Sequence, residues 1–188
     1  MNKLDQNYQP TQGYMLSFDQ ELPIYSDDLS VGNTLNFSKY HSVSDNLILS
    51  GKLFLKSVNS IDDDVRVSRR IYIPSKNLRG FEPGKIGPKD GVEYVGGNFG
   101  SALNLNSTIP NVLNGFENID LNFFFDAATL REVDYDSSLE SSKIRSSTGI
   151  AVNWFTVIGP LSFSYAIPLT KETTDQTESF RFQIGTSF

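Results

Sequence analysis

The most specific polar signal in the chain is one arginine, Arg79, in the glycine-rich part of a long segment. The segment extends from about Asn59 to Val95 and is far too long for a simple hairpin turn. A guanidinium held beside a flexible glycine and a packing aromatic presents a fixed fork of donors, which suits a carboxylate partner away from water. We therefore expect the segment to fold inward, whereas the alternative is a solvated loop with a surface arginine. The central motif of the segment consists of Leu78, Arg79, Gly80 and Phe81.

Other arrangements that could carry chemistry are weak. The single histidine, His41, lies in a predicted tight turn, with no nucleophile elbow and no evident carboxylate partner. The aspartates at 62–64 could bind calcium through their oxygens, but no EF-hand spacing follows and a solvated loop explains them better. The glycines at 96–97 lack the lysine of a phosphate-binding loop and precede a strand. We expect no catalytic residue, no metal site and no cofactor.

The composition limits the class of protein. The chain has 188 residues, which fit one domain, with 38% apolar residues and a mean hydropathy of −0.27. No segment is suited to span a bilayer as a helix, and the lack of cysteine excludes disulfides and thiolate metal sites. The net charge of −6 argues against a nucleic-acid partner. No apolar stretch follows Met1, so we expect a cytosolic protein, or a mature or truncated piece of an exported one.

Most of the chain consists of segments in which apolar and polar residues alternate with a period of two. This pattern predicts β-strands with one apolar face and essentially no helix. The eight predicted strands are residues 14–22, 31–39, 47–57, 98–106, 119–126, 145–157, 161–169 and 180–188. Short turns are expected at 41–46, 109–118 and 158–160.

The predicted connections alternate in length. Long polar loops at 23–30, 59–95, 131–143 and 170–179 alternate with the three short turns. Strands of about ten residues with an apolar, aromatic-rich face, joined in this way, are typical of transmembrane β-barrels. Trp154, Phe123 and Phe125 would then meet lipid on the outer face. A soluble β-sandwich is the alternative that the alternation leaves open.

Several short motifs follow one another in a distinctive order. They are Pro-Thr-x-Gly (10–13), Leu-Arg-Gly-Phe (78–81), Gly-Pro (87–88), Gly-Gly-Asn (96–98), Phe-Phe-Asp-Ala (124–127), Arg-Ser-Ser-x-Gly (145–149), Gly-Pro-Leu-x-Phe-Ser-Tyr-Ala-x-Pro-Leu (159–169) and Phe-x-Phe-x-Ile-Gly-x-x-Phe (180–188). In this order they resemble the carboxyl-terminal half of the barrel in the BamA family, the outer-membrane protein assembly factors of Gram-negative bacteria. The resemblance covers nearly the whole chain.

The resemblance implies a fold and a domain organisation. Members of the family have a sixteen-stranded antiparallel barrel preceded by periplasmic POTRA domains. Residues 1–188 would supply only the last eight strands, without the POTRA domains and the first half of the barrel. The eight strands would close on themselves, pair with another chain or stay an open sheet, and a closed barrel of eight would leave little room for an inward loop. We expect this portion alone to lack full insertion activity.

The resemblance also implies the site residues. In the family the long loop enters the barrel and its Arg-Gly-Phe motif anchors on the inner wall, which carries over to Arg79, Gly80 and Phe81. Asp126 matches the wall aspartate, and the alternation of its strand independently places it on the polar face. Asn106 stands where the family often has a second carboxylate, so Arg79 would have one charged partner instead of two. The last strand resembles the family's terminal signal, carried here by Phe180, Phe182, Ile184, Gly185 and Phe188.

The function implied by the resemblance is insertion of proteins into a membrane, not catalysis. The terminal strand would pair weakly with the first strand of the barrel, and opening there would offer an edge to an incoming client strand. The implied partners are outer-membrane lipid, unfolded β-barrel clients and, through POTRA domains, accessory lipoproteins, all at the bacterial outer membrane. The alternatives are sister families in autotransporter assembly or two-partner secretion, and a self-standing eight-stranded structural or adhesive barrel.

Overall fold

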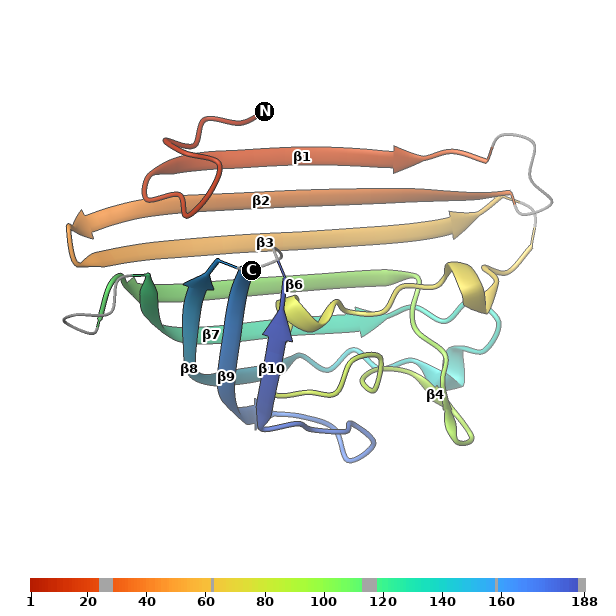
Figure 1. The fold of residues 1–188 in the computed structure, drawn as a ribbon. Helices are drawn as coiled ribbons and strands as arrows, with labels where there is room; N and C mark the ends of the chain where they lie inside the picture. Colours follow the sequence, from red (N-terminus) through yellow and green to blue (C-terminus); the bar gives the residue numbers. More distant parts are fainter. Residues whose placement is uncertain (24–28, 62, 113–117, 158, 186–188) are drawn as a thin grey trace.

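The chain forms one curved, antiparallel sheet of eight strands that follow one another in sequence order (Figure 1). The structure is a computed structural model, which describes residues 1–23, 29–61, 63–112, 118–157 and 159–185. The strands of the sheet are β1 (Gly13–Glu21), β2 (Ser30–Ser44), β3 (Leu47–Ser60), β6 (Phe99–Ile109), β7 (Ile119–Arg131), β8 (Arg145–Thr156), β9 (Gly159–Thr170) and β10 (Phe180–Ile184). The prediction of eight antiparallel strands is thereby confirmed.

The sheet is open in the part of the chain that the structure describes. There, β1 pairs only with β2 among the strands, β10 pairs only with β9, and no ladder joins β1 to β10. The seven strands other than β10 have 9 to 15 residues, which is the length that a tilted strand needs to cross a bilayer. Of the three arrangements expected from the sequence, a closed barrel of eight is not formed by the described residues, whose sheet stays open.

The two faces of the sheet differ in polarity. On the convex side, large apolar residues such as Phe18, Tyr165 and Ile167 are more than half exposed. On the concave side, polar residues such as Asn104 and Asp126 are buried. A soluble sandwich would bury its apolar face, whereas a transmembrane barrel exposes it to lipid. The polarity of the faces therefore favours the membrane barrel over the sandwich.

The connection between β3 and β6 lies against the concave face of the sheet (Figure 1). It contains the 3-10 turns η1 (Val67–Arg69) and η2 (Ser75–Asn77), and the small hairpin of β4 (Lys89–Asp90) and β5 (Glu93–Tyr94). A third 3-10 turn, η3 (Ser137–Leu139), lies between β7 and β8. The main hydrophobic core forms between this connection and the sheet, from Val58, Val65, Ile71, Ile73, Leu78, Phe81, Ile86, Ala102, Ala128 and Leu130. The connection is therefore a packed part of the interior.

Two of the predicted turns are wrong in extent. β2 continues through Ser44, so His41 lies in a strand instead of a tight turn. In the same way, Gly159 and Pro160 begin β9 and pair with β8. Backbone ladders continue past the last residue of an alternating pattern because their hydrogen bonds do not depend on apolar side chains. These two turns are consequently shorter than the pattern predicts.

No helix in the described ranges is long and apolar enough to cross a membrane.

Candidate functional site

The motif at 78–81 follows directly after η2 and is pressed against the concave wall. Leu78 and Phe81 are 3% and 2% exposed, so both apolar side chains are buried in the core. Gly80 has a φ of +88°, and a Cβ at this position would lie 3.0 Å from Cβ of Ala166 and 3.3 Å from Cβ of Ser147. The backbone therefore passes so close to β8 and β9 that only glycine fits without strain.

Arg79 makes a two-pronged ion pair with Asp126 of β7. Its Nε lies 2.7 Å from Oδ2 of Asp126, its Nη2 lies 2.7 Å from Oδ1, and its backbone N–H donates to Oδ2 at 3.1 Å. The side chain of Asp126 is fully buried, and that of Arg79 is 17% exposed. Bidentate pairs of this kind are the strongest and most directional of the ionic contacts in proteins. The structure thus brings together the two residues that the sequence singles out.

Further wall residues complete the surroundings of this pair. Nη2 of Arg79 also donates to Oδ1 of Asn106 at 2.9 Å, and the guanidinium carbon lies 3.5 Å from the ring centre of Phe124. Asn104 donates to Oδ1 of Asp126 at 2.7 Å. The hydroxyl of Ser147 donates to the backbone carbonyl of Arg79 at 2.5 Å. Strands β6, β7 and β8 therefore all hold the same arginine, and Asn106 serves as a neutral partner.

The segment that follows Arg79 pairs with the connection between β9 and β10. Phe81 forms an isolated bridge with Thr177. Backbone bonds link Glu82 N–H to the Gln176 carbonyl and Gln176 N–H to the Lys85 carbonyl, both at 3.0 Å. Glu178 N–H donates to the carbonyl of Gly80 at 3.2 Å. Two loops that lie far apart in the sequence are thus joined by a short ladder.

Arg181, on the concave side of β10, ties the terminal strand to the same loop. Its Nη2 donates to the carbonyl of Phe81 at 2.5 Å and to Oε2 of Glu178 at 2.7 Å, and its Nη1 donates to the carbonyl of Ser75 at 3.1 Å. Sequence reasoning assigned no role to Arg181. The sequence did hold a signal for such a role, because Arg181 is the one charged residue of the predicted last strand, 180–188.

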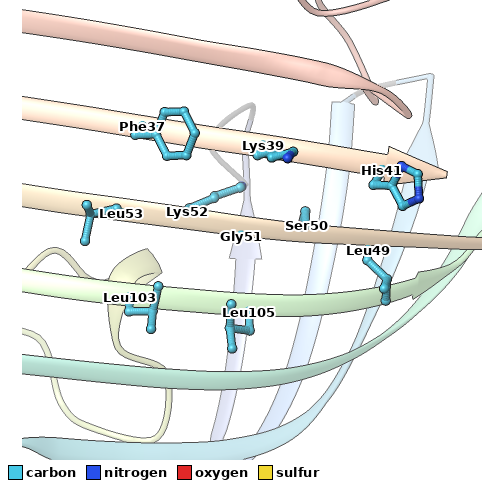
Figure 2. Close-up of a pocket in the computed structure, with 10 residues that line it drawn as sticks. All are labelled: Phe37, Lys39, His41, Leu49, Ser50, Gly51, Lys52, Leu53, Leu103 and Leu105. Atoms are coloured by element: carbon cyan, nitrogen blue, oxygen red, sulfur yellow. The ribbon is translucent and has the colours of Figure 1, made fainter. Parts of the chain in front are cut away.

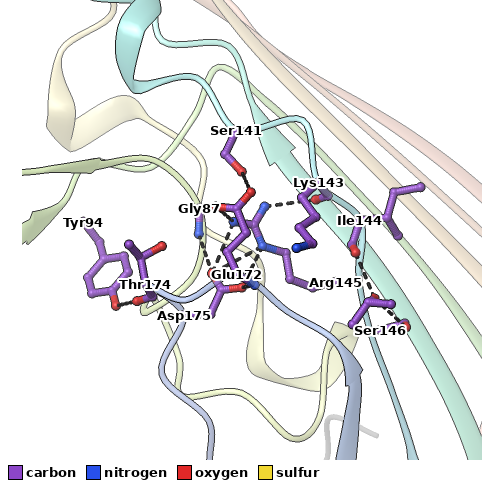
Figure 3. Close-up of polar contacts among 11 residues, drawn as sticks. Gly87, Tyr94, Ser141, Lys143, Ile144, Arg145, Ser146, Glu172, Thr174 and Asp175 are labelled. Carbon is purple, nitrogen blue, oxygen red and sulfur yellow. Dashed lines mark hydrogen bonds and ion pairs between the residues drawn. The ribbon is translucent and has the colours of Figure 1, made fainter.

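A second buried arginine holds the connection between β9 and β10 to the wall (Figure 3). The side chain of Arg145, at the start of β8, is fully buried, and its Nε lies 3.0 Å from Oδ2 of the equally buried Asp175. Its Nη2 lies 3.2 Å from Oε2 of Glu172. Asp175 also accepts a 3.4 Å hydrogen bond from the N–H of Gly87, and the hydroxyl of Tyr94 donates to a carbonyl in the same connection. Sequence reasoning missed this ion-pair cluster.

A third cluster joins the beginning of the long connection to the loop after β7. Arg70 forms an ion pair with Asp134 and donates through Nε to the carbonyl of Val65 at 3.0 Å, while Val65 N–H donates to Oδ2 of Asp134 at 2.7 Å. Burial raises the pKa of Asp134, but the hydrogen bonds from Val65 and Asn98 and the charge of Arg70 outweigh it, so the net pKa lies below the usual value. Asp134 is therefore held as a carboxylate.

The remaining residues singled out from the sequence lie apart from the loop anchor. Phe180, Phe182 and Ile184 point outward and are 59%, 46% and 66% exposed, and Gly185 has a φ of +140°. Phe188 and Asp62 lie outside the described residues. Among the residues that the structure describes, no group of three or more His, Cys, Asp or Glu side chains could hold a metal ion.

The whole chain is similar to known proteins of one superfamily. A model of the Omp85 superfamily domain matches residues 1–188. The chain is 30% identical over 142 residues to the outer membrane protein assembly factor BamA of Neisseria meningitidis serogroup B, covering 60% of this chain and 18% of the relative. It is 28% identical over 191 residues to the protein of the same name in Nitratidesulfovibrio vulgaris, covering 96% of this chain and 23% of the relative.

A solved structure shows the same fold. The crystal structure of BamA from Haemophilus ducreyi lacking POTRA domains 1–3 is similar to this chain, with a TM-score of 0.88 and 30% sequence identity. The match covers 96% of this chain and 40% of that one. The chain thus spans less than half the length of each of these relatives.

Proposed function

This chain belongs to the Omp85 superfamily, and we propose that it forms the part of an outer-membrane protein assembly factor that carries the loop anchor and the terminal strand. The family inferred from the order of the motifs is thereby confirmed, as is the location in the outer membrane of Gram-negative bacteria. The relatives named as assembly factors support the function. The chain would contribute to folding and inserting β-barrel proteins into that membrane.

One observation carries this proposal: the buried ion pair of Arg79 and Asp126 holds the loop on the concave face of the sheet. The buried pair holds the connection between β3 and β6 against a wall whose other face is apolar. A connection held in this way braces the wall from its concave side. The loop anchor is formed by Leu78, Arg79, Gly80 and Phe81, and its wall partners are Asp126 and Asn106.

The terminal strand supplies the second part of the proposed mechanism. Within the described residues β10 has one neighbour, β9, and its other edge carries unpaired backbone donors and acceptors. Such an edge is a template for a further strand. We infer that an unfolded β-barrel client pairs with this edge, and that the residues of the strand, with Phe188, form its terminal signal. The role is to template and guide strands, so no catalytic residue is proposed.

The domain organisation is part of the same proposal. Residues 1–188 would be the carboxyl-terminal portion of a larger barrel, in line with the 18% to 40% of the relatives' lengths that the matches cover. Accessory lipoproteins would then act through POTRA domains elsewhere in the assembly factor. Outer-membrane lipid is the partner of the apolar face.

A chimera tests the proposal directly. This chain would replace the matching segment of the Neisseria meningitidis assembly factor, and cells depleted of the native protein would be scored for growth and for folded, heat-modifiable client barrels. We expect the chimera to support assembly and its Arg79→Glu form to fail. Lys76→Glu is the control, because Lys76 is an exposed cation of the same connection.

The outcomes separate the function from the anchor. If the unaltered chimera reaches the membrane but assembles no clients, the proposed function is wrong. If the chimera works and Arg79→Glu works equally well, the anchor has no part in it. A charge exchange, Arg79→Glu with Asp126→Arg, should restore part of the activity when the ion pair is what matters.

A further inference from the structure

A groove interrupts the convex, apolar face of the sheet over the middle of β3 (Figure 2). Its volume is about 520 Å³, which lies within the range of about 300–1,000 Å³ that is usual for sites of small ligands. Its apolar walls come from three neighbouring strands, through Phe37 of β2, Leu49 and Leu53 of β3, and Leu103 and Leu105 of β6. Lys39 and His41 stand along the β2 side.

The groove exists because Gly51 has no side chain. In the register of the sheet, Gly51 lies between Lys39 on β2 and Leu105 on β6. A Cβ at Gly51 would meet only Cδ2 of Leu105, at an ordinary contact distance of 3.6 Å, and the φ of Gly51 lies outside the left-handed region. Neither the backbone nor the neighbouring atoms therefore require glycine here, and a larger side chain would simply fill the space.

The charge beside the groove is unusual for its surroundings. In the strand residues that the structure describes, the register places Lys39 and Arg131 on the convex face, and no other Lys, Arg, Asp or Glu. Arg131 is the last residue of β7, at the long-loop end, and its guanidinium lies over the ring of Phe99. Lys39 is exposed beside leucines. A cation on a membrane-facing surface needs a head group or another anion within reach.

The position along the strand identifies the leaflet. Lys39 and His41 lie five and three residues before Ser44, where β2 ends at a short turn. In outer-membrane barrels the short turns are periplasmic. At about 3.3 Å per residue, Lys39 lies about 17 Å along a tilted strand from that end. A lysine side chain at this depth extends to the head-group region of the periplasmic leaflet.

We propose that this groove is a binding site for an anionic glycerophospholipid of the periplasmic leaflet. One acyl chain lies over Gly51, between the leucines of β3 and β6. The phosphate accepts hydrogen bonds from the ammonium group of Lys39 and from the imidazole N–H of His41. The site lies on β2, β3 and β6, away from the edge at β10, and the apolar walls with one cationic side fit an anionic lipid better than a neutral one.

Quenching of tryptophan fluorescence by brominated lipids tests the site. Trp154, on the convex face of β8, reports lipid contact away from the groove. A Ser107→Trp variant with Trp154→Phe reports the groove, since Ser107 pairs with Leu49 but does not line it. The whole chain is folded in neutral detergent, checked by heat-modifiable mobility, and titrated with brominated phosphatidylglycerol or brominated phosphatidylcholine.

We expect brominated phosphatidylglycerol to quench the groove reporter at an about fivefold lower concentration than brominated phosphatidylcholine does, because one ammonium near an anionic head group contributes about this factor. The two lipids should quench Trp154 equally. Lys39→Gln with His41→Gln should remove the preference, and Gly51→Leu should remove it by filling the groove. Lys171→Gln, an exposed loop lysine, is the charge control and should change nothing.

Three results would overturn the proposal. The first is an equal preference at the two reporters, which would mean a general effect of the acidic lipid. The second is a preference that survives both Lys39→Gln with His41→Gln and Gly51→Leu. The third is a groove reporter that neither lipid quenches while Trp154 is quenched, which would mean that protein covers the groove.

Discussion

Replacing Asp126 by alanine should release the anchored loop from the wall while the sheet stays folded. Asp126 is fully buried and accepts four hydrogen bonds, three from Arg79 and one from Asn104. Without the carboxylate, the guanidinium stays in the interior with only the amide of Asn106 and the ring of Phe124 as partners. Breaking a buried ion pair on one side costs about 3–5 kcal/mol.

This cost sets the expected size of the effect. The backbone N–H of Arg79 itself donates to Asp126, so its hydrogen exchange reports the opening of the loop. Each 1.4 kcal/mol corresponds to a factor of about ten in the opening equilibrium. We therefore expect amide exchange at 79–82 to accelerate about 10²- to 10⁴-fold in Asp126→Ala, while amides in the ladder of β8 and β9 keep their protection.

The assay is hydrogen exchange of the folded chain in detergent, followed by mass spectrometry of peptides that cover 79–82 and β9. Asp64→Ala removes an exposed carboxylate of the same connection and serves as the control. Arg79→Met with Asp126→Leu replaces the whole pair by apolar side chains, which is often neutral for a buried pair. This double variant should recover most of the protection that Asp126→Ala loses.

Exchange at 79–82 in Asp126→Ala that stays within tenfold of the parent would contradict an anchor based on this ion pair. The same holds if Arg79→Met with Asp126→Leu leaves the loop as unprotected as Asp126→Ala does. The first result would mean that apolar packing of Leu78 and Phe81 holds the loop without help from the ion pair. The second would mean that the protection lost in Asp126→Ala does not come from leaving one buried charge unpaired.

Three further predictions concern the contacts around the anchor. Gly80→Ala should lower the stability of the loop by about 1–2 kcal/mol through its left-handed backbone alone, and by more through contact with Ala166, which limited proteolysis of the loop would show. Asp175→Asn leaves the buried Arg145 without its main charge partner, so cleavage at 171–179 should rise steeply and the melting temperature should fall. Because the pKa of Asp134 is lowered, its stabilising effect is complete above the unfolded pKa of about 4 and is lost as the pH falls through the folded value; Asp134→Asn should abolish that acid sensitivity of the loop after β7.

The fold was largely predictable because a membrane barrel places lipid on one side of each strand and a polar interior on the other. That arrangement produces the period-two alternation in Leu161–Leu169 and in the other strands. Strand ends were not predictable in the same way. His41 and Pro160 continue ladders by backbone pairing, which leaves no side-chain pattern.

The site was predictable only where a motif marks both partners. Arg79 and Asp126 each stand in a recognisable motif, and their contact is present in the structure. Arg145 and Asp175 are 30 residues apart, with the aspartate in a loop that looks merely polar. Arg181 binds a backbone carbonyl 100 residues away, at Phe81. No residue type identifies a carbonyl as a partner, so this contact requires the three-dimensional structure.

The hydrogen bonds from Arg181 to Ser75 and Phe81 make the loop and the terminal strand parts of one linked equilibrium. Drawing β10 away from β9 has to break these bonds or pull the loop along. Linkage is reciprocal, so docking of the loop and pairing of β10 favour each other by the same coupling free energy, and tightening the loop on the wall raises the cost of moving β10 by at most what these bonds contribute. The buried loop is in this sense a latch on the exposed edge, and the strength of the Arg79 ion pair helps to set how readily that edge is released.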